Sequence, residues 1–267
     1  RTPLEEILQI FEVAVKAGAN RLVIADTSGF LRPLSVRYLI SRVRDGLSQI
    51  FSKEVPLSVH CHNDFGLATA NTLAAVEEGV TYVHTCIAGF GERAGVAPFE
   101  EVVAALELLY KIDTGVDLKK LYRLAQLAEK SFALPIQYHK PIIGENAFSY
   151  EVDEHIHAML AHPLLYEPFP PEIIERGITF YFGRQTGKHL VENRLASAGI
   201  KASPWQIDEI VRRIRSIQES MDKGGTQMTF YQIKKLMRDL RKGLTEEEFW
   251  RIVEQVTKQK PKLPPTS

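Results

Sequence analysis

One stretch, His60-Cys61-His62-Asn63-Asp64, limits what this chain of 267 residues can fold into more than any other. Residues 56–59 before it contain apolar and β-branched side chains and predict a short strand, along which successive side chains point to opposite faces. His60 and His62 therefore share a face, about 7 Å apart along the strand, and both can reach one divalent metal ion. Two hydrogen-bonded core histidines are the alternative, and the pair by itself does not decide between them.

Helix and strand patterns alternate through the first 110 residues. An amphipathic helix opens at a capping box of Thr2 and Glu5, with Pro3 at its first position, and Gly18 ends it. Helices also follow the predicted strands, which cover residues 21–25, 56–59 and 82–87; these helices lie at residues 35–50, 67–78 and 98–110. Because a helix follows each strand, we expect parallel strands with right-handed crossovers.

Three strands are too few to close a (β/α)8 barrel, and they fit the last part of one. Histidines at the carboxyl end of a strand, followed by a loop and a helix, lie where such barrels carry their chemistry. An open doubly wound sheet is the alternative, but no Gly-x-Gly-x-x-Gly motif opens a helix after the first strand. The predicted fold class is α/β.

From Thr114 onward the pattern changes to helices joined by irregular segments that contain proline. A brief strand is predicted at residues 179–182, and helices are predicted at residues 118–132, 150–160, 188–198, 204–221, 229–240 and 245–258. We therefore divide the chain into a partial barrel (residues 1–113), a helical linker (114–175) and a small, mainly helical subdomain (176–267).

The charge balance excludes some classes of partner. The chain has 33 Lys and Arg residues against 33 Asp and Glu residues, which argues against nucleic acid or an anionic membrane as an obligate partner. No apolar run is long enough to span a bilayer. Cys61 and Cys86 both fall in predicted strands and are interpreted as reduced thiols of a cytoplasmic protein. The sequence opens with Arg1 next to a helix signal, so we expect one part of a split or truncated protein.

Three motifs, in this order, resemble the isopropylmalate/homocitrate synthase family. They are His60-Cys61-His62-Asn63-Asp64-x-Gly66, Gly91-Glu92-Arg93-Ala94-Gly95 and Gly144-Glu145-Asn146-Ala147-Phe148. The family consists of metal-dependent acyltransferases with a TIM barrel, within the superfamily of HMG-CoA lyase. The resemblance runs from Arg1 to about Gly199 and implies barrel strands six to eight, a linker and small subdomains. The family's first five strands are not in this sequence. Nor is its Asp-Arg-Glu motif, which supplies a third metal ligand and a catalytic arginine.

Family members join acetyl-CoA to a 2-oxo acid in a Claisen condensation, and the resemblance implies the same activity here. A divalent metal (Mg, Mn or Zn) would polarise the ketone of the 2-oxo acid as a Lewis acid. The implied metal ligands are His60 and His62. The implied catalytic residues are His155, Glu92 and Tyr166, and the implied substrate-binding residues are Thr27, Asp26, Asn63 and Arg93.

For some of these residues, a purely structural role is the alternative. An ion pair between Glu92 and Arg93 that holds their loop is the alternative to a role in the reaction. For Thr27 the alternative is a turn cap. His157 and His162 are interpreted as surface residues. His155 aligns with a family histidine that reaches into the active site of a second subunit, so we expect a homodimer, or a hetero-oligomer with a chain that carries the missing barrel half.

The chain departs from the family pattern at three places. Val96 replaces an asparagine of isopropylmalate synthases and favours a homocitrate-like activity on a dicarboxylic 2-oxo acid such as 2-oxoglutarate or oxaloacetate. Gln185 stands where a histidine is usual. The family's His-Glu-Ser-Gly-Ile-His is replaced by Tyr150-Glu151-Val152-Asp153-Glu154-His155, which changes the surroundings of the implied acid–base histidine.

Two other functions remain open at this stage. One is an aldol-type lyase of the same superfamily, against which the appended linker and helical subdomain argue. The other is a non-catalytic regulatory or assembly subunit. The intact His-x-His favours an enzyme, because a scaffold has no need of two metal ligands on one face of a strand.

Overall fold

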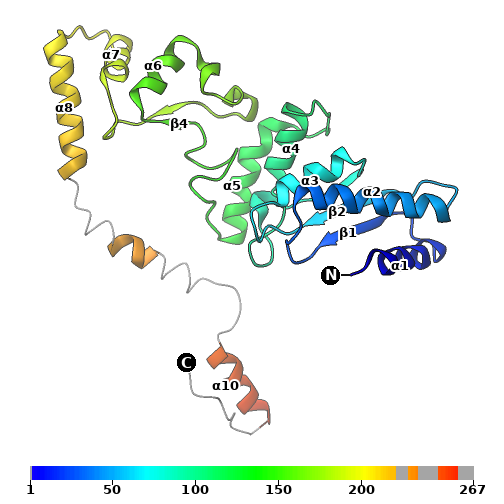
Figure 1. Cartoon of the computed structure of the whole chain (residues 1–267). Coiled ribbons are helices and arrows are strands. Elements are labelled where there is room, and N and C mark those ends of the chain that lie inside the picture. The colour runs from blue at the N-terminus through cyan, green and yellow to red at the C-terminus, as the bar shows by residue number, and fades with distance from the viewer. Residues whose placement is uncertain (1, 221–227, 234–245, 258–267) are drawn as a thin grey trace. The chain divides into compact units, whose positions relative to one another are not determined.

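The computed structural model describes residues 2–220, 228–233 and 246–257, and it begins with a parallel sheet. The sheet has the order β1-β2-β3, from Leu22–Asp26, Leu57–Cys61 and Tyr82–His84 (Figure 1). Leu22 lies beside Leu57, and His60 lies beside His84. Parallel strands that alternate with helices make this a mixed α/β fold, as predicted.

One face of this sheet carries the main core. Helix α2 (Pro33–Ile50) buries Val36, Ile40, Val43 and Leu47, which recur every three or four residues along one stripe. These side chains form one apolar cluster with residues of the strands, among them Leu22 and Val59. Helices α1 (Leu4–Lys16), α3 (Ala68–Glu77) and α4 (Phe99–Leu108) are the other helices of this part, and consecutive helices contact one another.

The opposite face of the sheet is less covered. Leu22, Ile24 and Asp26 of β1 are buried, whereas Val23 and Ala25 between them are exposed. The register places His60 on the same face as Ala25 and His84, because paired residues of neighbouring strands share a face. The two-residue period therefore sets His60 on the face that the helices leave open.

Three local predictions in this part are corrected. Helix α1 has Pro3 at its N-cap and no side-chain cap bond, because Thr2 lies one residue too early for the capping position. Strand β3 ends at His84, and the chain then enters a 3-10 turn, η1 (Ile87–Gly89), in which Ala88 has a φ of 56°. Cys86 therefore lies beyond the strand. Cys61 is fully buried, and burial raises the pKa of its thiol to about 11.

A second, smaller core follows. Leu121, Phe148 and Ile174 form its buried centre. They come from helix α5 (Leu121–Phe132), from the residue before strand β4 (Ser149–Tyr150) and from the 3-10 turn η4 (Pro171–Ile174). A 3-10 turn, η2 (Leu118–Lys120), leads into α5.

The helix predicted from residue 150 begins later. Tyr150 belongs to β4, which pairs in parallel with β5 (Thr179–Phe180), and the Tyr181 N–H donates to the Tyr150 carbonyl. Helix α6 (Asp153–Ala161) starts three residues on, with Asp153 and Glu154 in its first turn, where acidic side chains favour the helix dipole. A pairing partner about 30 residues away thus overrides the local helical pattern.

The remaining described segments are mainly helical. The 3-10 turn η3 (Pro163–Leu165) follows α6, and helix α7 (Lys188–Ser197) buries Leu190 and Val191. Helices α8 (Pro204–Ser220) and α10 (Glu246–Thr257) follow, and residues 228–233 are also helical. The rest of the helix predicted at 229–240, and the ends of the one predicted at 245–258, lie outside the described residues.

Contacts divide the chain into two units, Arg1–Arg212 and Arg213–Ser267. The candidate site residues all lie in the first unit. The three-part division drawn from the change of pattern along the sequence stays a prediction.

Within the described ranges, no helix combines the length and apolarity needed to cross a membrane.

Candidate functional site

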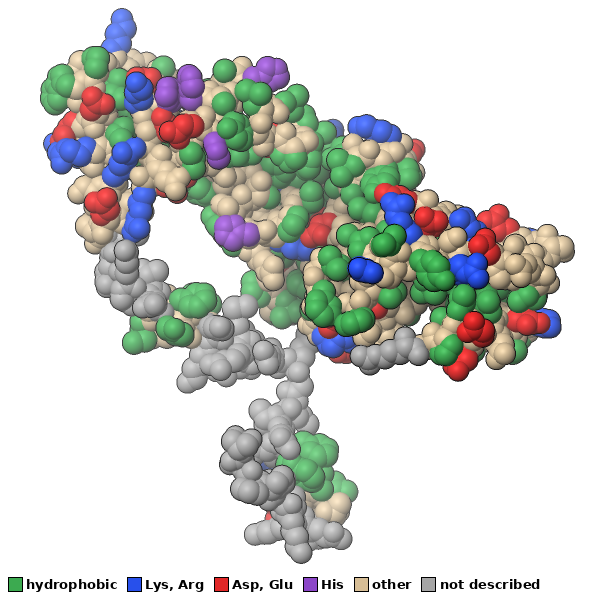
Figure 2. Space-filling model, in the orientation of Figure 1, with side chains coloured by type: hydrophobic (Ala, Val, Ile, Leu, Met, Phe, Trp, Pro, Cys, Tyr) green, Lys and Arg blue, Asp and Glu red, His purple; other side chains and the backbone are tan. Residues whose placement is uncertain are grey.

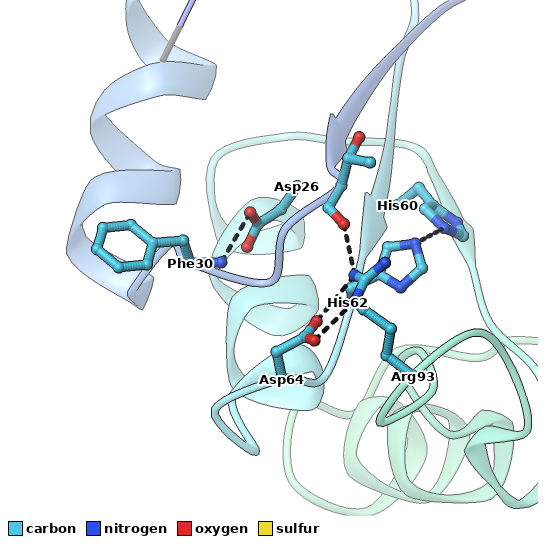
Figure 3. Close-up of polar contacts among 7 residues, drawn as sticks. Asp26, Phe30, His60, His62, Asp64 and Arg93 are labelled. Atoms are coloured by element: carbon cyan, nitrogen blue, oxygen red, sulfur yellow. Dashed lines mark hydrogen bonds and ion pairs between the residues drawn. The ribbon is translucent and has the colours of Figure 1, made fainter. Parts of the chain in front are cut away.

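His60 and His62 meet at the end of β2 (Figure 3). Their Nε2 atoms lie 3.2 Å apart, with the two rings edge to face. Two nitrogen ligands that each lie about 2.1 Å from one ion are separated by roughly 3.0 Å at a right angle and roughly 3.4 Å at the tetrahedral angle. The measured separation lies between these values, so the pair fits a divalent ion as two of its ligands.

The surroundings of His60 favour its neutral imidazole, which is the form that binds metals. Burial, and then the nearby His62 and His84, lower the pKa of His60. The His62 Nδ1 atom is buried and has no hydrogen-bond partner in the described part of the chain. An unpaired Nδ1 does not decide between the two interpretations, because a histidine that binds a metal through Nε2 also usually donates a hydrogen bond through Nδ1. The separation of the Nε2 atoms is the observation that favours metal binding, which stays a prediction.

The described residues bring together two candidate metal ligands and no larger cluster. Within residues 2–220, 228–233 and 246–257, no group of three or more His, Cys, Asp or Glu side chains is arranged to hold a metal ion. A divalent ion bound here would need its remaining ligands from water, substrate or other protein residues.

Arg93 joins three loops next to the histidines (Figure 3). Its Nε and Nη2 atoms donate to the two carboxylate oxygens of Asp64 at 2.8 and 2.9 Å, and Nη2 also donates to the Thr27 carbonyl at 2.6 Å. The hydrogen bond from Arg93 is the main cause of the lowered pKa of Asp64. An ion pair between Glu92 and Arg93 was predicted to hold their loop, and this prediction is wrong about the acidic residue. Asp64 forms the ion pair with Arg93, and Glu92 is exposed.

Two of the predicted substrate-binding residues also serve local structure. The buried Asp26 carboxylate accepts hydrogen bonds from the Phe30 and Leu31 N–H groups, both at 3.0 Å, and so closes the turn after β1 (Figure 3). The Asn63 Oδ1 atom accepts from the Ala68 N–H and so fixes the start of α3. Thr27 has an exposed side chain. Of these three residues, Thr27 is the most accessible to a substrate.

A cleft of about 400 Å³ lies beside this cluster. Its walls are the glycine-rich loop at residues 88–95 and the linker segment at 134–140, and Asn63, Arg93, Gln137 and Lys140 add polar groups. The glycines allow close backbone contact, because a Cβ on Gly95 (φ 89°) would lie 2.0 Å from the Gly89 carbonyl oxygen. Because Asn63 lines the cleft, the cleft lies next to the residue that follows His62.

Lys140 ties the linker to α4 at the wall of the cleft. Its Nζ atom lies 2.5 Å from Glu101 Oε1 and 3.7 Å from Glu100 Oε1. The Glu100 Oε2 atom accepts from the Ala88 N–H and so holds the turn that begins the glycine-rich loop. Lys140, Glu100 and Asp64 were not predicted to belong to this site, although Asp64 lies inside the first motif.

The other predicted catalytic pair forms a separate group. The rings of His155, on α6, and Tyr166, after η3, are stacked with centroids 4.3 Å apart and planes 27° apart. Tyr166 is exposed, as are Leu164 and Leu165 before it. Figure 1 shows α6 apart from β2, with α4 and α5 between them. The structure therefore does not bring this pair to His60 and His62 of the same chain.

Further histidines lie near His155. Figure 2 shows histidine side chains gathered on the surface around α6. His189 Nδ1 lies 2.6 Å from Asp153 Oδ2, and the ring of His157 stacks on His189 with centroids 3.9 Å apart. His157 and His162 are exposed, as predicted. The link between Asp153 and His189 fixes the N-terminus of α6 against α7.

Two families match the chain. The HMGL-like family matches residues 1–128, and the family described as "Homocitrate synthase post-HMGL domain-like" matches residues 142–222.

Known proteins align with most of the chain. A 2-isopropylmalate synthase of Methanocaldococcus jannaschii is 39% identical over 258 residues, which are 95% of this chain and 48% of that protein. A putative (R)-citramalate synthase of Methanopyrus kandleri is 38% identical over 217 residues, 81% of this chain and 42% of that protein. The chain thus spans about half the length of the curated relatives it matches.

Among solved structures, an HMG-CoA lyase of Bacillus subtilis aligns with 51% of this chain and 46% of its own, at 27% identity and a TM-score of 0.45. That overlap is too small to carry an argument about the fold.

Proposed function

The chain belongs to the isopropylmalate/homocitrate synthase family, and from this premise we propose that it is part of an acyltransferase that condenses acetyl-CoA with a 2-oxo acid. The observation that carries the proposal is the convergence of the His60 and His62 Nε2 atoms, 3.2 Å apart, on the open face of the sheet. Substrates would bind beside the Arg93 clamp, which is the set of hydrogen bonds from Arg93 to Asp64 and to the Thr27 carbonyl, and in the cleft next to it.

The proposed fold of the complete enzyme is a (β/α)8 barrel of which this chain supplies strands six to eight. Three parallel strands with helices on one face support this, as does the uncovered face that carries Val23 and His60. The other barrel half would come from the rest of a longer chain or from a separate subunit, and it would supply the missing metal ligand. The proposed parts remain residues 1–113, 114–175 and 176–267.

His60 and His62 would hold the divalent metal as neutral ligands. The metal would supply Lewis acidity to the keto group of the 2-oxo acid. Thr27 would donate a hydrogen bond to the substrate carboxylate, and its exposed side chain directly after β1 supports this role. Arg93 keeps that loop in place through the Thr27 carbonyl, while Asp26 and Asn63 shape the turns on either side. Glu92, exposed in the same loop as Arg93, is the remaining candidate for contact with substrate.

The acid–base residue in this proposal is His155. A neutral imidazole can accept a proton from the methyl group of acetyl-CoA at neutral pH. The stacked Tyr166 ring fixes its plane. Since α6 lies apart from β2 in the same chain, His155 would serve the site of a second subunit in a two-fold assembly. The exposed Leu164 and Leu165 next to Tyr166 support a protein contact at this place.

The 2-oxo acid is proposed to be dicarboxylic, as in homocitrate synthases. Val96, which carries this proposal, is buried and forms an antiparallel bridge with His62, so it lies beside the proposed metal ligand. A panel of 2-oxoglutarate, oxaloacetate and 2-oxo acids with branched apolar side chains would rank the substrates by kcat/KM. Preference for a branched apolar acid would contradict this part of the proposal.

The test of the activity uses the chain assembled with the complementary barrel half. Release of free CoA from acetyl-CoA is measured with each 2-oxo acid, and bound metal is measured by elemental analysis. The His60→Ala/His62→Ala variant is expected to lose both the metal and turnover. His162→Ala, which changes an exposed histidine, is the matched control and should keep both. A double variant that retains its metal at wild-type affinity would show that the metal assignment is wrong.

A further inference from the structure

Tyr150 stands where the family has a histidine, and its hydroxyl makes a contact outside its own strand. The Tyr150 hydroxyl donates to the backbone carbonyl of Tyr166, at 3.3 Å and across 16 residues. Tyr150 ends β4, and β5 holds its backbone through the Tyr181 N–H. A rigid strand end thus reaches the segment that follows η3.

A buried carboxylate lies beside this contact. Glu167 is only 5% exposed, and neither of its carboxylate oxygens has a hydrogen bond of good geometry to any described residue. An isolated buried charge is costly, so burial raises the pKa of Glu167; Tyr150 opposes this shift and Glu172 adds to it.

The phenol is also kept in its neutral form. Burial, and then the negative charge of Glu167, raise the pKa of Tyr150 to about 12. A phenol with the ordinary pKa of about 10 is already neutral at pH 7, so Tyr150 has one proton to donate, and the geometry directs it to the Tyr166 carbonyl.

The contact continues to the proposed acid–base residue. Tyr166 is fixed through its carbonyl by Tyr150, and its ring stacks on His155 at 4.3 Å between centroids. Tyr166 is itself 44% exposed, so packing alone gives its ring little restraint. A hydrogen bond to its backbone is the restraint that the described residues provide from outside its own segment.

We infer that Tyr150 is a positioning residue: its hydroxyl holds the backbone of Tyr166, and the Tyr166 ring in turn holds the imidazole of His155. This role rests on the proposed function, in which His155 moves the proton. The geometry itself does not depend on that function, so the two can be tested apart.

The first test measures ring geometry without catalysis. NMR spectra of the assembly with the complementary barrel half, in which only the 267-residue chain carries labelled histidine, record the ring-proton shifts of His155, which respond to the stacked Tyr166 ring. In Tyr150→Phe these shifts should move toward those of Tyr166→Ala, which marks the loss of stacking. Tyr181→Phe changes a tyrosine beside the same small sheet and is the matched control; its His155 shifts should stay at wild-type values.

The second test measures turnover in the completed enzyme. Misplacing a reacting group by a fraction of an ångström to 1 Å costs roughly tenfold to a hundredfold in rate. Tyr150→Phe should lower kcat by about that factor and leave KM within about twofold. Tyr150→His restores a donor of the family type and should recover part of the lost rate.

The outcomes separate the two proposals. Unchanged His155 shifts in a folded Tyr150→Phe chain would overturn the positioning role, whatever the enzyme does. If Tyr150→Phe fails to fold, as judged by circular dichroism, Tyr150→Leu, which also lacks a donor, decides: His155 shifts like those of Tyr166→Ala support the role, and shifts at wild-type values overturn it. An assembled enzyme that is inactive with every 2-oxo acid would refute the proposed function while the NMR result stands.

Discussion

Glu100 is almost fully buried, yet its carboxylate serves two partners. One oxygen accepts from the Ala88 N–H, and the other lies 3.7 Å from the Lys140 ammonium group. Burial is the largest influence and raises the pKa of Glu100, although the backbone hydrogen bonds and Lys140 oppose it. The folded chain therefore binds a proton at Glu100 more tightly than the unfolded chain does.

This shift predicts a particular pH dependence of stability. The stabilisation from the protonated Glu100 is complete below the ordinary glutamate pKa of 4.5 and is lost as pH rises through the raised value. In Glu100→Gln this loss is absent, so the free energy of unfolding of the wild type should fall relative to the variant over that window. The total loss across the window is about 1.4 kcal/mol for each unit by which the pKa is raised.

Urea unfolding of both proteins between about pH 4 and pH 7 measures this difference. Glu5→Gln, at an exposed position of α1, is the control and should track the wild type at every pH. A constant difference between wild type and Glu100→Gln across the range would mean that Glu100 has the same pKa in the folded and unfolded chain.

For single residues, the sequence predicted those positions that follow from the regular alternation of side chains along one strand. His60 and His62 share a face because strand side chains alternate, and the structure confirms it. The partner of Arg93 was not predictable in this way, since Asp64 lies 29 residues earlier and meets it only through the pairing of the strands. The roles of Tyr150 and Glu167 were missed for the same reason: the hydrogen bond from Tyr150 to Tyr166, the residue before Glu167, depends on how β4 lies against the turn after α6.

At the scale of helices and strands, the contact that Asp153 of α6 makes with His189 and Leu190 of α7 depends on Gly187. Asp153 accepts from the Leu190 N–H and binds His189, both at the start of α7. A Cβ on Gly187 would lie 2.2 Å from the Asp153 carboxyl group. The backbone of Gly187 is extended (φ −118°), so the missing side chain matters here for space and not for conformation.

Gly187→Ala is therefore expected to push the Asp153 carboxylate away from His189 and from the Leu190 N–H. Overpacking of this kind typically costs about 1–3 kcal/mol of the free energy of unfolding. Thermal unfolding followed by circular dichroism measures it, with Gly177→Ala as the control, since a Cβ there would meet nothing within 4 Å. Equal melting temperatures for the two variants would show that the carboxylate moves aside without loss.

Element length decided which parts of the fold could be predicted. The helices that became α1, α2 and α5 have long amphipathic runs, and the predictions were close to the observed bounds. The two-residue strand β4 has no period to detect, so its residues were assigned to the following helix. Its existence depends on β5, which lies beyond two 3-10 turns and a helix.

In the whole molecule, the unpaired outer edges of the sheet are the features that most favour association with other chains. In the described part of the chain, β1 and β3 each pair with β2 alone, which leaves one ladder edge of each strand free. Val23, Tyr82, Phe30 and Phe65 add exposed apolar surface around the strands and their loops. Free edges and apolar surface of this kind favour association with other chains.

The chain expressed alone is therefore expected to dimerise or aggregate, and co-expression with the complementary barrel half should give one defined, soluble assembly. Light scattering after size-exclusion chromatography measures the mass in each case. A stable monomer of 30.2 kDa without any partner would argue against the half-barrel arrangement.

The Arg93 clamp also bears on the order in which the chain folds. Arg93 lies 29 residues from Asp64 and 66 residues from Thr27, so its hydrogen bonds close long stretches of chain. Contacts that close long loops carry an entropic cost, which nearby contacts must offset first. The guanidinium can meet both partners only when all three strands lie side by side. A refolding chain should accordingly acquire its helices early, and the loops around His62 should gain protection from hydrogen exchange last.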